Sequence, residues 1–428
     1  MSPRKPLPTS IRRTVRYRAL GAGAAITLAV TLAGCASSAP TAPTGGPASA
    51  PVGGDGLAPV SNGAAQVALS LTADGGGTCT LDHTSAPAGP VTFTVTNVSA
   101  TGITEVELQS DLKILGEKEN LAPGLPASTF TVTLGGGSYN LYCPGAATEL
   151  VPFTVTGDAA PSPTGSTQQL LAKGATDYAA WVVSQTEEMQ TSVKALASAI
   201  DSGDLAKAKT AYAQSRPFYE KIESDVEGFV LPGFKLDDSA GSLDYRIDMR
   251  ASSLDDKVGW MGYHAIERDL FSTGKITATT KKYATDLVAN VGKLLEVVKT
   301  LDYKPEDLAN GAASLLEEVQ SNKITGEEEE FSHLDLMDFA YNIEGAKQAF
   351  AYLQPGLEKV DASLAEQVAA EFKKVDASLA AYRDDTALGG YLSWTKANRE
   401  KHSRQLSQTV LALQQPLAKI AEKVATAK

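Results

Sequence analysis

Histidine and cysteine are scarce in this sequence, which argues against several kinds of catalytic site. The 428 residues include 4 histidines and 3 cysteines. The zinc-peptidase motif HExxH is absent, because His264 is followed by Ala265 and the second histidine position holds Arg268. From residue 169 onward there is neither a cysteine nor a GxSxG nucleophile motif. Peptidase chemistry of the common types is therefore disfavoured.

Clusters of basic residues are also missing from most of the chain. The formal net charge is −12, and the first 34 residues carry six positive charges and no acidic residue. Without those six the net charge is about −18, and no basic tract remains. We therefore expect no nucleic-acid partner, because binding to phosphates requires clustered lysine and arginine. An acidic chain of this kind also favours the attraction of cations.

Residues 1–34 predict a lipoprotein signal peptide. An apolar run follows the basic stretch and ends in LAGC, the pattern of a lipobox. Cleavage there leaves Cys35 as a lipid-modified first residue, so we expect a chain anchored to a membrane and not spanning it. The alternative is an uncleaved short membrane helix, although the run is short for a span. The pair Arg12 and Arg13 leaves both Sec and twin-arginine export open.

Two shifts in composition predict a multidomain α+β protein. Residues 35–64, rich in Ala, Ser, Pro, Thr and Gly, predict a disordered tether. Residues 65–157 contain short alternating segments such as VTFTVTNV, separated by Gly and Pro turns, which are typical of a β-sandwich. Residues 158–168 form a second linker. From 169 to 428 apolar residues recur at helical spacing, which predicts two antiparallel helix bundles over 169–300 and 304–428.

The predicted sandwich contains an even pair of cysteines and few other metal ligands. An ordinary blue-copper centre needs two histidines, a cysteine and usually a methionine, whereas this region has His83 alone and no methionine. Cys79 and Cys143 form either a disulfide, which export favours, or a pair of thiolate ligands. Glu105 and Glu107 alternate with apolar residues on a strand, so they share a face and are further candidate ligands.

In the helical part, His264 and Glu267 stand three residues apart and therefore on one helix face. Glu220, Glu223 and Glu227 are expected along one stripe of another helix. Alone, such patterns are more often solvated pairs or wet helix faces than metal ligands.

A second acidic segment runs from Glu327 to Asp338. It is expected to be the first turn of a helix capped by Thr325, in which acidic residues complement the helix dipole. The competing hypothesis is an auxiliary metal site formed by His333 with Glu330 or Asp335, with Glu220 as a further candidate.

Four ordered segments resemble characteristic blocks of the imelysin-like family. They are RPFYEKIE, LDYRID, GYHAIERDLF and GEEEEFSHLDLMDFAYNIEGA. The resemblance implies an all-α imelysin-like domain preceded by a cupredoxin-like sandwich. It also implies a metal site built by Glu223, Asp248, His264 and Glu267, with Asp244 as an alternative to Asp248. Three carboxylates and one imidazole form a hard ligand set suited to iron.

The resemblance implies a lipid-anchored protein on the outer face of the cytoplasmic membrane that binds Fe³⁺ or Fe²⁺ and delivers it to a permease. Zinc is a possible substitute, and copper remains an open candidate for the sandwich. The implied partners are an EfeU-like iron permease and an EfeB-like haem peroxidase. We expect a protein that is not an enzyme. The rival readings are a metal-dependent hydrolase that uses the same His-x-x-Glu site and a structural lipoprotein.

Overall fold

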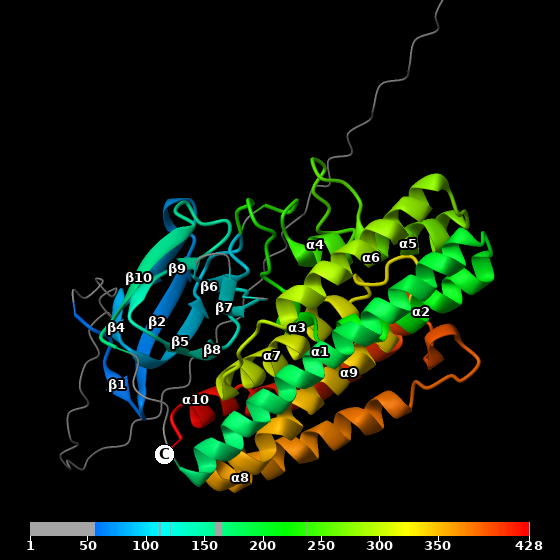
Figure 1. The fold of residues 1–428 in the computed structure, drawn as a ribbon. Coiled ribbons are helices and arrows are strands. Elements are labelled where there is room, and N and C mark those ends of the chain that lie inside the picture. The colour runs from blue at the N-terminus through cyan, green and yellow to red at the C-terminus, as the bar shows by residue number, and fades with distance from the viewer. Residues whose placement is uncertain (1–55, 111–112, 120, 159–164, 237, 428) are drawn as a thin grey trace, which may run out of the picture. The chain divides into compact units, whose positions relative to one another are not determined.

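The computed structural model describes residues 56–110, 113–119, 121–158, 165–236 and 238–427. The predicted signal peptide, Cys35 and most of the predicted tether lie outside these residues. Strands come first and helices follow, as expected, and both belong to one structural unit (Figure 1). Within the described ranges, no helix is both long and apolar enough to cross a membrane.

Two five-stranded sheets form the N-terminal part. One has the order β1-β2-β5-β8, with β3 paired to β2, and the other has the order β4-β10-β9-β6-β7. The strands are β1 (Val60–Ser61), β2 (Ala64–Thr72), β3 (Thr78–Leu81), β4 (Ser85–Pro87), β5 (Gly89–Asn97), β6 (Val106–Ser110), β7 (Lys113–Lys118), β8 (Ser128–Leu134), β9 (Gly137–Tyr142) and β10 (Leu150–Thr156).

The two sheets share one hydrophobic core, as a sandwich requires. Phe93 on β5 contacts Phe130 on β8 and Phe153 on β10, with ring centroids 5.1 and 5.2 Å apart. Because β5 and β10 lie in different sheets, these rings join the two inner faces. Cys79 on β3 and Cys143 after β9 are joined by a disulfide, which also links the sheets. As disulfide sulfurs, they offer no thiolate to a metal.

The sandwich begins before the boundary predicted at residue 65. β1 pairs with the start of β2 through a two-residue turn of Asn62 and Gly63, whose φ angles are 53° and 90°. Positive φ at both positions is the requirement of a type I′ hairpin, and Asn-Gly meets it at little steric cost. The polar composition of the preceding segment concealed this hairpin.

Helices make up the rest of the chain. They are α1 (Ser166–Asp201), α2 (Leu205–Glu220), α3 (Glu223–Val226), α4 (Leu243–Asp248), α5 (Gly262–Glu267), α6 (Ala278–Val298), α7 (Pro305–Glu318), α8 (Asp335–Ala380), α9 (Lys396–Leu417) and α10 (Ile420–Ala425). Short 3₁₀ or π-helical segments are η1 (Asp74–Gly76), η2 (Arg268–Thr273), η3 (Val319–Lys323) and η4 (Leu388–Gly390).

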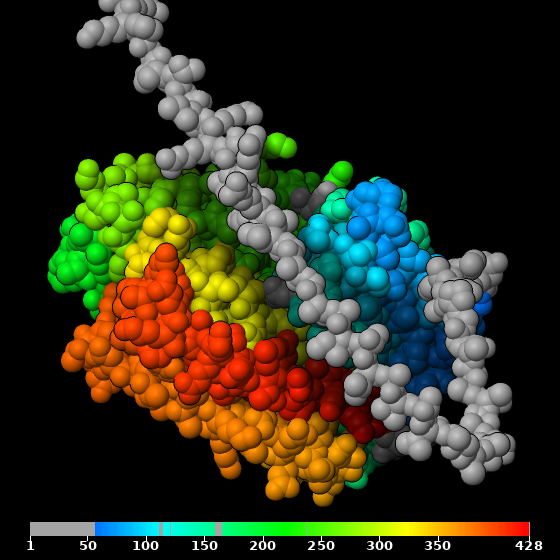
Figure 2. Space-filling view, turned by 180° about the vertical axis from the view of Figure 1, so that it is seen from behind, coloured from blue at the N-terminus to red at the C-terminus, as the bar shows by residue number. Residues whose placement is uncertain are grey.

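The helix boundaries follow local chemistry. Asp204 caps α2 by accepting from the backbone N–H groups of Ala206 and Lys207, and Thr277 caps α6. Pro305 stands at the start of α7, where its missing N–H costs nothing. The predicted halves 169–300 and 304–428 share one hydrophobic core, because α1 packs against α8 as well as α2 and α6. In Figure 2, the orange and red C-terminal helices lie beside the yellow segment around α7, which α9 and α10 contact.

The expected helix cap at Thr325 is wrong. Thr325 donates its hydroxyl hydrogen bond back to the carbonyl groups of Ser321 and Asn322, and α8 begins only at Asp335. Gly326 has φ of 76° and His333 has φ of 61°, so a right-handed helix cannot run through them. The acidic run at residues 327–330 is consequently part of a folded loop.

Candidate metal centre

Ionisable side chains are concentrated in the interior of the helical part. The residues concerned are at most 4 % exposed: Arg216, Glu220, Glu223, Asp248, His264, Glu267, Glu318, Lys323, Glu328, Glu329, Asp335 and Asp338. Removing a charge from water costs several kcal/mol unless an opposite charge compensates it. A cluster of this kind therefore requires internal cations, a bound cation, or both.

A glycine brings α5 against the end of α4. Gly262 has φ of 63°, and a Cβ atom there would lie 2.1 Å from the carbonyl oxygen of Ile247. No other residue fits this backbone contact without displacement. The close approach places His264, in the first turn of α5, next to Asp248 at the end of α4.

The two ring nitrogens of His264 have different surroundings. Nδ1 lies 2.9 Å from Glu267 Oε2. Nε2 lies 3.4 Å from both Asp248 Oδ1 and Glu328 Oε1, and among the described residues it has no hydrogen-bond partner. An orphaned, buried imidazole nitrogen between two carboxylates is the arrangement expected of a metal ligand.

Asp248, His264 and Glu328 each offer one ligand atom, and these atoms lie within 4.8 Å of one another. Oxygen and nitrogen atoms on opposite sides of a cation are separated by about 4–5 Å when each bond is 2.0–2.4 Å long. The three residues can therefore surround one ion. Two carboxylates and an imidazole suit iron and also accept zinc or manganese.

Glu267 fixes the orientation of the His264 ring through Nδ1, the nitrogen that does not face the site. Its Oε1 accepts hydrogen bonds from the backbone N–H groups of Phe331 and Ser332, at 2.8 and 2.7 Å, and its Oε2 faces His264 Nδ1. Both oxygens are thus engaged, and the carboxylate fixes the ring with Nε2 directed at the site. Helix spacing alone predicts the same role for both residues, but the structure gives them different roles. His264 faces the site, and Glu267 orients the His264 ring.

Glu328 is the central anion of the cluster. Oε1 lies 3.1 Å from Arg216 Nη2, and Oε2 lies 3.1 Å from Lys323 Nζ and 3.3 Å from Arg250 Nη1. Burial alone would raise the pKa of Glu328. Lys323, Arg250 and His264 lower it by more than burial raises it, so the pKa is held well below its usual value. Glu328 is therefore ionised, which is the state that binds a metal.

The pKa of His264 is shifted in the opposite direction to that of Glu328. Burial lowers the pKa of its imidazole, but Asp248, Glu267 and Glu328 raise it more, so the pKa stands well above its usual value. Without a metal, the protonated ring supplies a positive charge among these carboxylates. A metal ion that binds at Nε2 must displace this proton.

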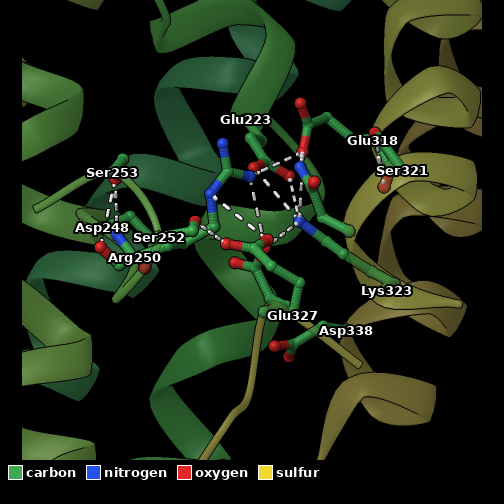
Figure 3. Close-up of polar contacts among 12 residues, drawn as sticks. Glu223, Asp248, Arg250, Ser252, Ser253, Glu318, Ser321, Lys323, Glu327 and Asp338 are labelled. Carbon is green, nitrogen blue, oxygen red and sulfur yellow. Dashed lines mark hydrogen bonds and ion pairs between the residues drawn. The ribbon is translucent and has the colours of Figure 1, made fainter. Parts of the chain in front are cut away.

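Arg216 and Lys323 are buried cations of the same cluster. Arg216 contacts the carboxylates of Glu220, Asp248, Glu328, Glu329 and Asp338. Lys323 contacts those of Glu220, Glu223, Glu318 and Glu328. Figure 3 shows Glu223, Glu318 and Arg250 converging around Lys323. These contacts keep the carboxylates buried while no metal is bound.

Glu220, Glu223 and Glu227 do not form one helical stripe. α2 ends at Glu220, Ile222 has non-helical angles of φ −125° and ψ 11°, and α3 restarts at Glu223. Asn342 on α8 donates to the freed carbonyl oxygen of Glu220, at 2.8 Å, and to Glu223 Oε2, at 3.0 Å. Glu220 and Glu223 are buried on either side of this interruption, whereas Glu227 groups with Glu119 and Glu318 instead.

The structure divides the predicted ligand set. It brings Asp248 and His264 together and adds Glu328. Glu223 instead groups with Glu318 and Glu328, and Glu220 groups with Glu328 and Asp338. Asp244 accepts the hydroxyl hydrogen bond of Tyr219 and does not replace Asp248.

The predicted auxiliary ligands are not brought together. Glu330 is exposed, whereas Asp335 is buried and accepts the backbone N–H of Glu329 through Oδ1 at 3.1 Å. Among the described residues, none of the groups that could hold a metal contains His333. The left-handed backbone at His333 explains the separation, since it turns the chain between the acidic loop and α8.

Comparison with known proteins identifies the class of this chain. The imelysin (peptidase M75) family matches residues 174–420, which include all the residues of the buried cluster. The chain belongs to the imelysin family.

Within that family the chain resembles EfeO. It is 35% identical over 335 residues to the "Iron uptake system component EfeO" of Escherichia coli strain K12, covering 78% of this chain and 85% of the relative. EfeO of Shigella flexneri and of Shigella sonnei match to the same extent. These relatives are named as iron-uptake components and not as enzymes, in agreement with the expectation for this chain.

Proposed function

We propose that this protein captures iron outside the cytoplasmic membrane and delivers it to a membrane permease. The observation that carries the proposal is the orphaned Nε2 of His264 between the carboxylates of Asp248 and Glu328. Its support is the identity of 35% with iron-uptake components over most of the chain. The ligand set is hard and anionic, which suits both Fe²⁺ and Fe³⁺.

The chain's own residues prepare the site for an ion. Glu267 keeps Nδ1 of His264 occupied. Asp248 and Glu328 supply negative charge, and Arg216 and Lys323 hold these two carboxylates in place. Iron is the cargo, so binding has to be reversible. Displacement of the His264 proton by iron makes capture and release dependent on proton exchange.

Delivery follows from the proposed anchor. A lipid on Cys35 and the tether that follows it would hold the protein at the outer face of the membrane, within reach of an EfeU-like permease and an EfeB-like haem peroxidase. The sandwich, cupredoxin-like in this proposal, serves as a docking module and not as a copper site, since its two cysteines are bonded to each other.

Replacing His264 by alanine tests the proposal. We expect the affinity for Fe²⁺, measured under argon by equilibrium dialysis, to fall at least about 100-fold, because loss of a ligand costs no less than loss of the groups that orient it. His83→Ala is the matched control, since His83 also lies beside a carboxylate, 3.2 Å from Asp82, but in the sandwich and with its side chain 26% exposed. Equal iron binding by wild type and His264→Ala would refute the proposal.

Glu267→Gln tests the orienting role separately. The glutamine oxygen would accept the backbone N–H groups of Phe331 and Ser332, leaving its amide N–H₂ to face Nδ1. A neutral His264 would then carry its proton on Nε2, where the metal binds. We expect an affinity loss of about 10–100-fold. The exposed Glu344→Gln, which removes a surface partner of Lys221, should bind iron like the wild type.

A further inference from the structure

A second concentration of carboxylates lies where the sandwich meets the helices. On the β6–β7 hairpin, Glu107 stands directly opposite Glu117. Glu105 lies two residues before Glu107, and Glu119 lies two residues after Glu117, so all four carboxylates share one face. Like charges directly opposite each other destabilise a sheet. The single lysine between Glu117 and Glu119, Lys118, points elsewhere and pairs with Glu317 at 2.7 Å.

Two helical residues complete this cluster. Glu227 lies immediately after α3, and Glu318 is the last residue of α7. Ligand atoms of Glu119, Glu227 and Glu318 lie within 4.8 Å of one another, the spacing that a shared cation would produce. The sandwich and the helical part thus each contribute to one group of oxygens.

Glu318 offers one unpaired carboxylate oxygen to this group. It is 1 % exposed; its Oε2 accepts from Arg250 Nη1 at 2.8 Å, whereas its Oε1 is buried without a hydrogen-bond partner in the described part of the chain. Glu227 Oε2 is orphaned in the same way. Within the described ranges, no lysine or arginine pairs with Glu105, Glu107, Glu117, Glu119 or Glu227. Burial accordingly raises the pKa values of Glu105, Glu119 and Glu227 well above normal.

A cavity gives access to this group. It has a volume of about 190 Å³ and is lined by residues of both parts, among them Glu117, Glu227, Tyr303 and Lys304. Two members of the acidic cluster therefore stand at its wall, and a hydrated ion can approach them from this side.

We propose that Glu119, Glu227 and Glu318 form a second binding site for a hard metal cation, of the class of Fe²⁺, Fe³⁺ or Mn²⁺, between the sandwich and the helices. Glu105, Glu107 and Glu117 surround it and supply further negative charge. An all-oxygen set of this kind selects hard cations over copper(I). The site is separate from the His264 centre and does not depend on the function proposed for that centre.

Shared carboxylates connect the two sites. Glu318 also groups with Glu223 and Glu328, and Glu328 groups with Asp248 and His264. Arg250 and Lys323 each contact both Glu318 and Glu328, so these two cations link the two groups of carboxylates.

The double variant Glu119→Gln/Glu227→Gln tests the second site. With the full chain, Fe²⁺ under argon and metal analysis after equilibrium dialysis, we expect two ions bound by the wild type, one by the double variant and one by His264→Ala. Glu296→Gln, an exposed carboxylate on α6, is the control and should bind two. The metal-free double variant should melt no lower than the wild type, because it replaces two carboxyl groups that no lysine or arginine compensates by amides that need no compensation.

The outcomes separate the two proposals. If the double variant binds as many ions as the wild type, the second site is refuted. If the wild type binds a single ion that the double variant loses and His264→Ala retains, the second site stands and the function proposed for the His264 centre fails. A metal-free double variant that melts well below the wild type would also contradict the proposal, since it would show a stabilising hydrogen-bond network in place of an unfilled cation site.

Discussion

Replacing Arg216 by methionine is expected to destabilise the helical part by about 3–5 kcal/mol. Methionine fills much of the same volume but leaves the carboxylates of Glu220, Asp248, Glu328, Glu329 and Asp338 without their shared cation. All five are buried, so water cannot compensate the lost charge. The measurement is denaturant unfolding of the metal-free protein, followed by the helical circular dichroism signal.

The guanidinium geometry matters as well as its charge. Arg216 uses Nε, Nη1 and Nη2 on different carboxylates, and a lysine offers one compact ammonium group in their place. Arg216→Lys should therefore be less destabilised than Arg216→Met but still less stable than the wild type. The exposed Arg404→Met on α9 is the control, and its free energy of unfolding should change by no more than about 0.5 kcal/mol. An Arg216→Met protein as stable as this control would show that the carboxylates are neutral in the metal-free state.

The same substitution bears on iron binding. Arg216 contacts Asp248 and Glu328, which are the two carboxylates of the proposed iron centre. Its charge therefore opposes a metal ion electrostatically while it holds the ligands in position. Arg216, Lys323 and protonated His264 supply the positive charge that allows so many carboxylates to remain buried in the metal-free protein.

The helices could be predicted from the sequence because their ends depend on nearby residues. The site could be predicted only in part, because it depends on packing between residues far apart in the sequence. The breaks at residues 201–204 and before Pro305 follow from Asp, Gly and Pro, which act over a few residues. The closeness of His264 and Glu267 follows from helix geometry. Their different roles do not, because Glu267 is engaged by backbone N–H groups of residues 331 and 332, far along the chain.

Glu328 and Arg216 show what periodicity cannot supply. Glu328 lies in a run of four glutamates within a loop, where no repeat distinguishes the buried members from the exposed one. A charged residue in a helix is normally exposed to solvent. Arg216 is buried because five carboxylates, from its own helix and three other segments, converge on it. Partners so distant in sequence are fixed only by the tertiary fold.

The variant Glu328→Gln is expected to lower the affinity for Fe²⁺ about 1,000-fold. Removing one unit charge about 4 Å from a cation costs about 4 kcal/mol per cation charge at an effective dielectric constant near 20. For a cation with a single charge, this is already about a 1,000-fold change in affinity. The loss should exceed that of His264→Ala, since alanine removes a ligand without removing a negative charge. Equilibrium dialysis of all variants under the same anaerobic conditions gives the comparison.

Glu330→Gln is the matched control for this prediction, because it makes the same chemical change two residues away in the same run of glutamates. Glu330 is exposed, whereas Glu328 is 1 % exposed and contacts Arg216, Arg250 and Lys323. The sequence motif alone treats the two as equivalent, and an auxiliary site at Glu330 would make both variants defective. Loss of iron binding in Glu328→Gln alone would support the folded loop as the source of the ligand. Equal losses in both variants would contradict it, and wild-type affinity in Glu328→Gln would remove Glu328 from the centre.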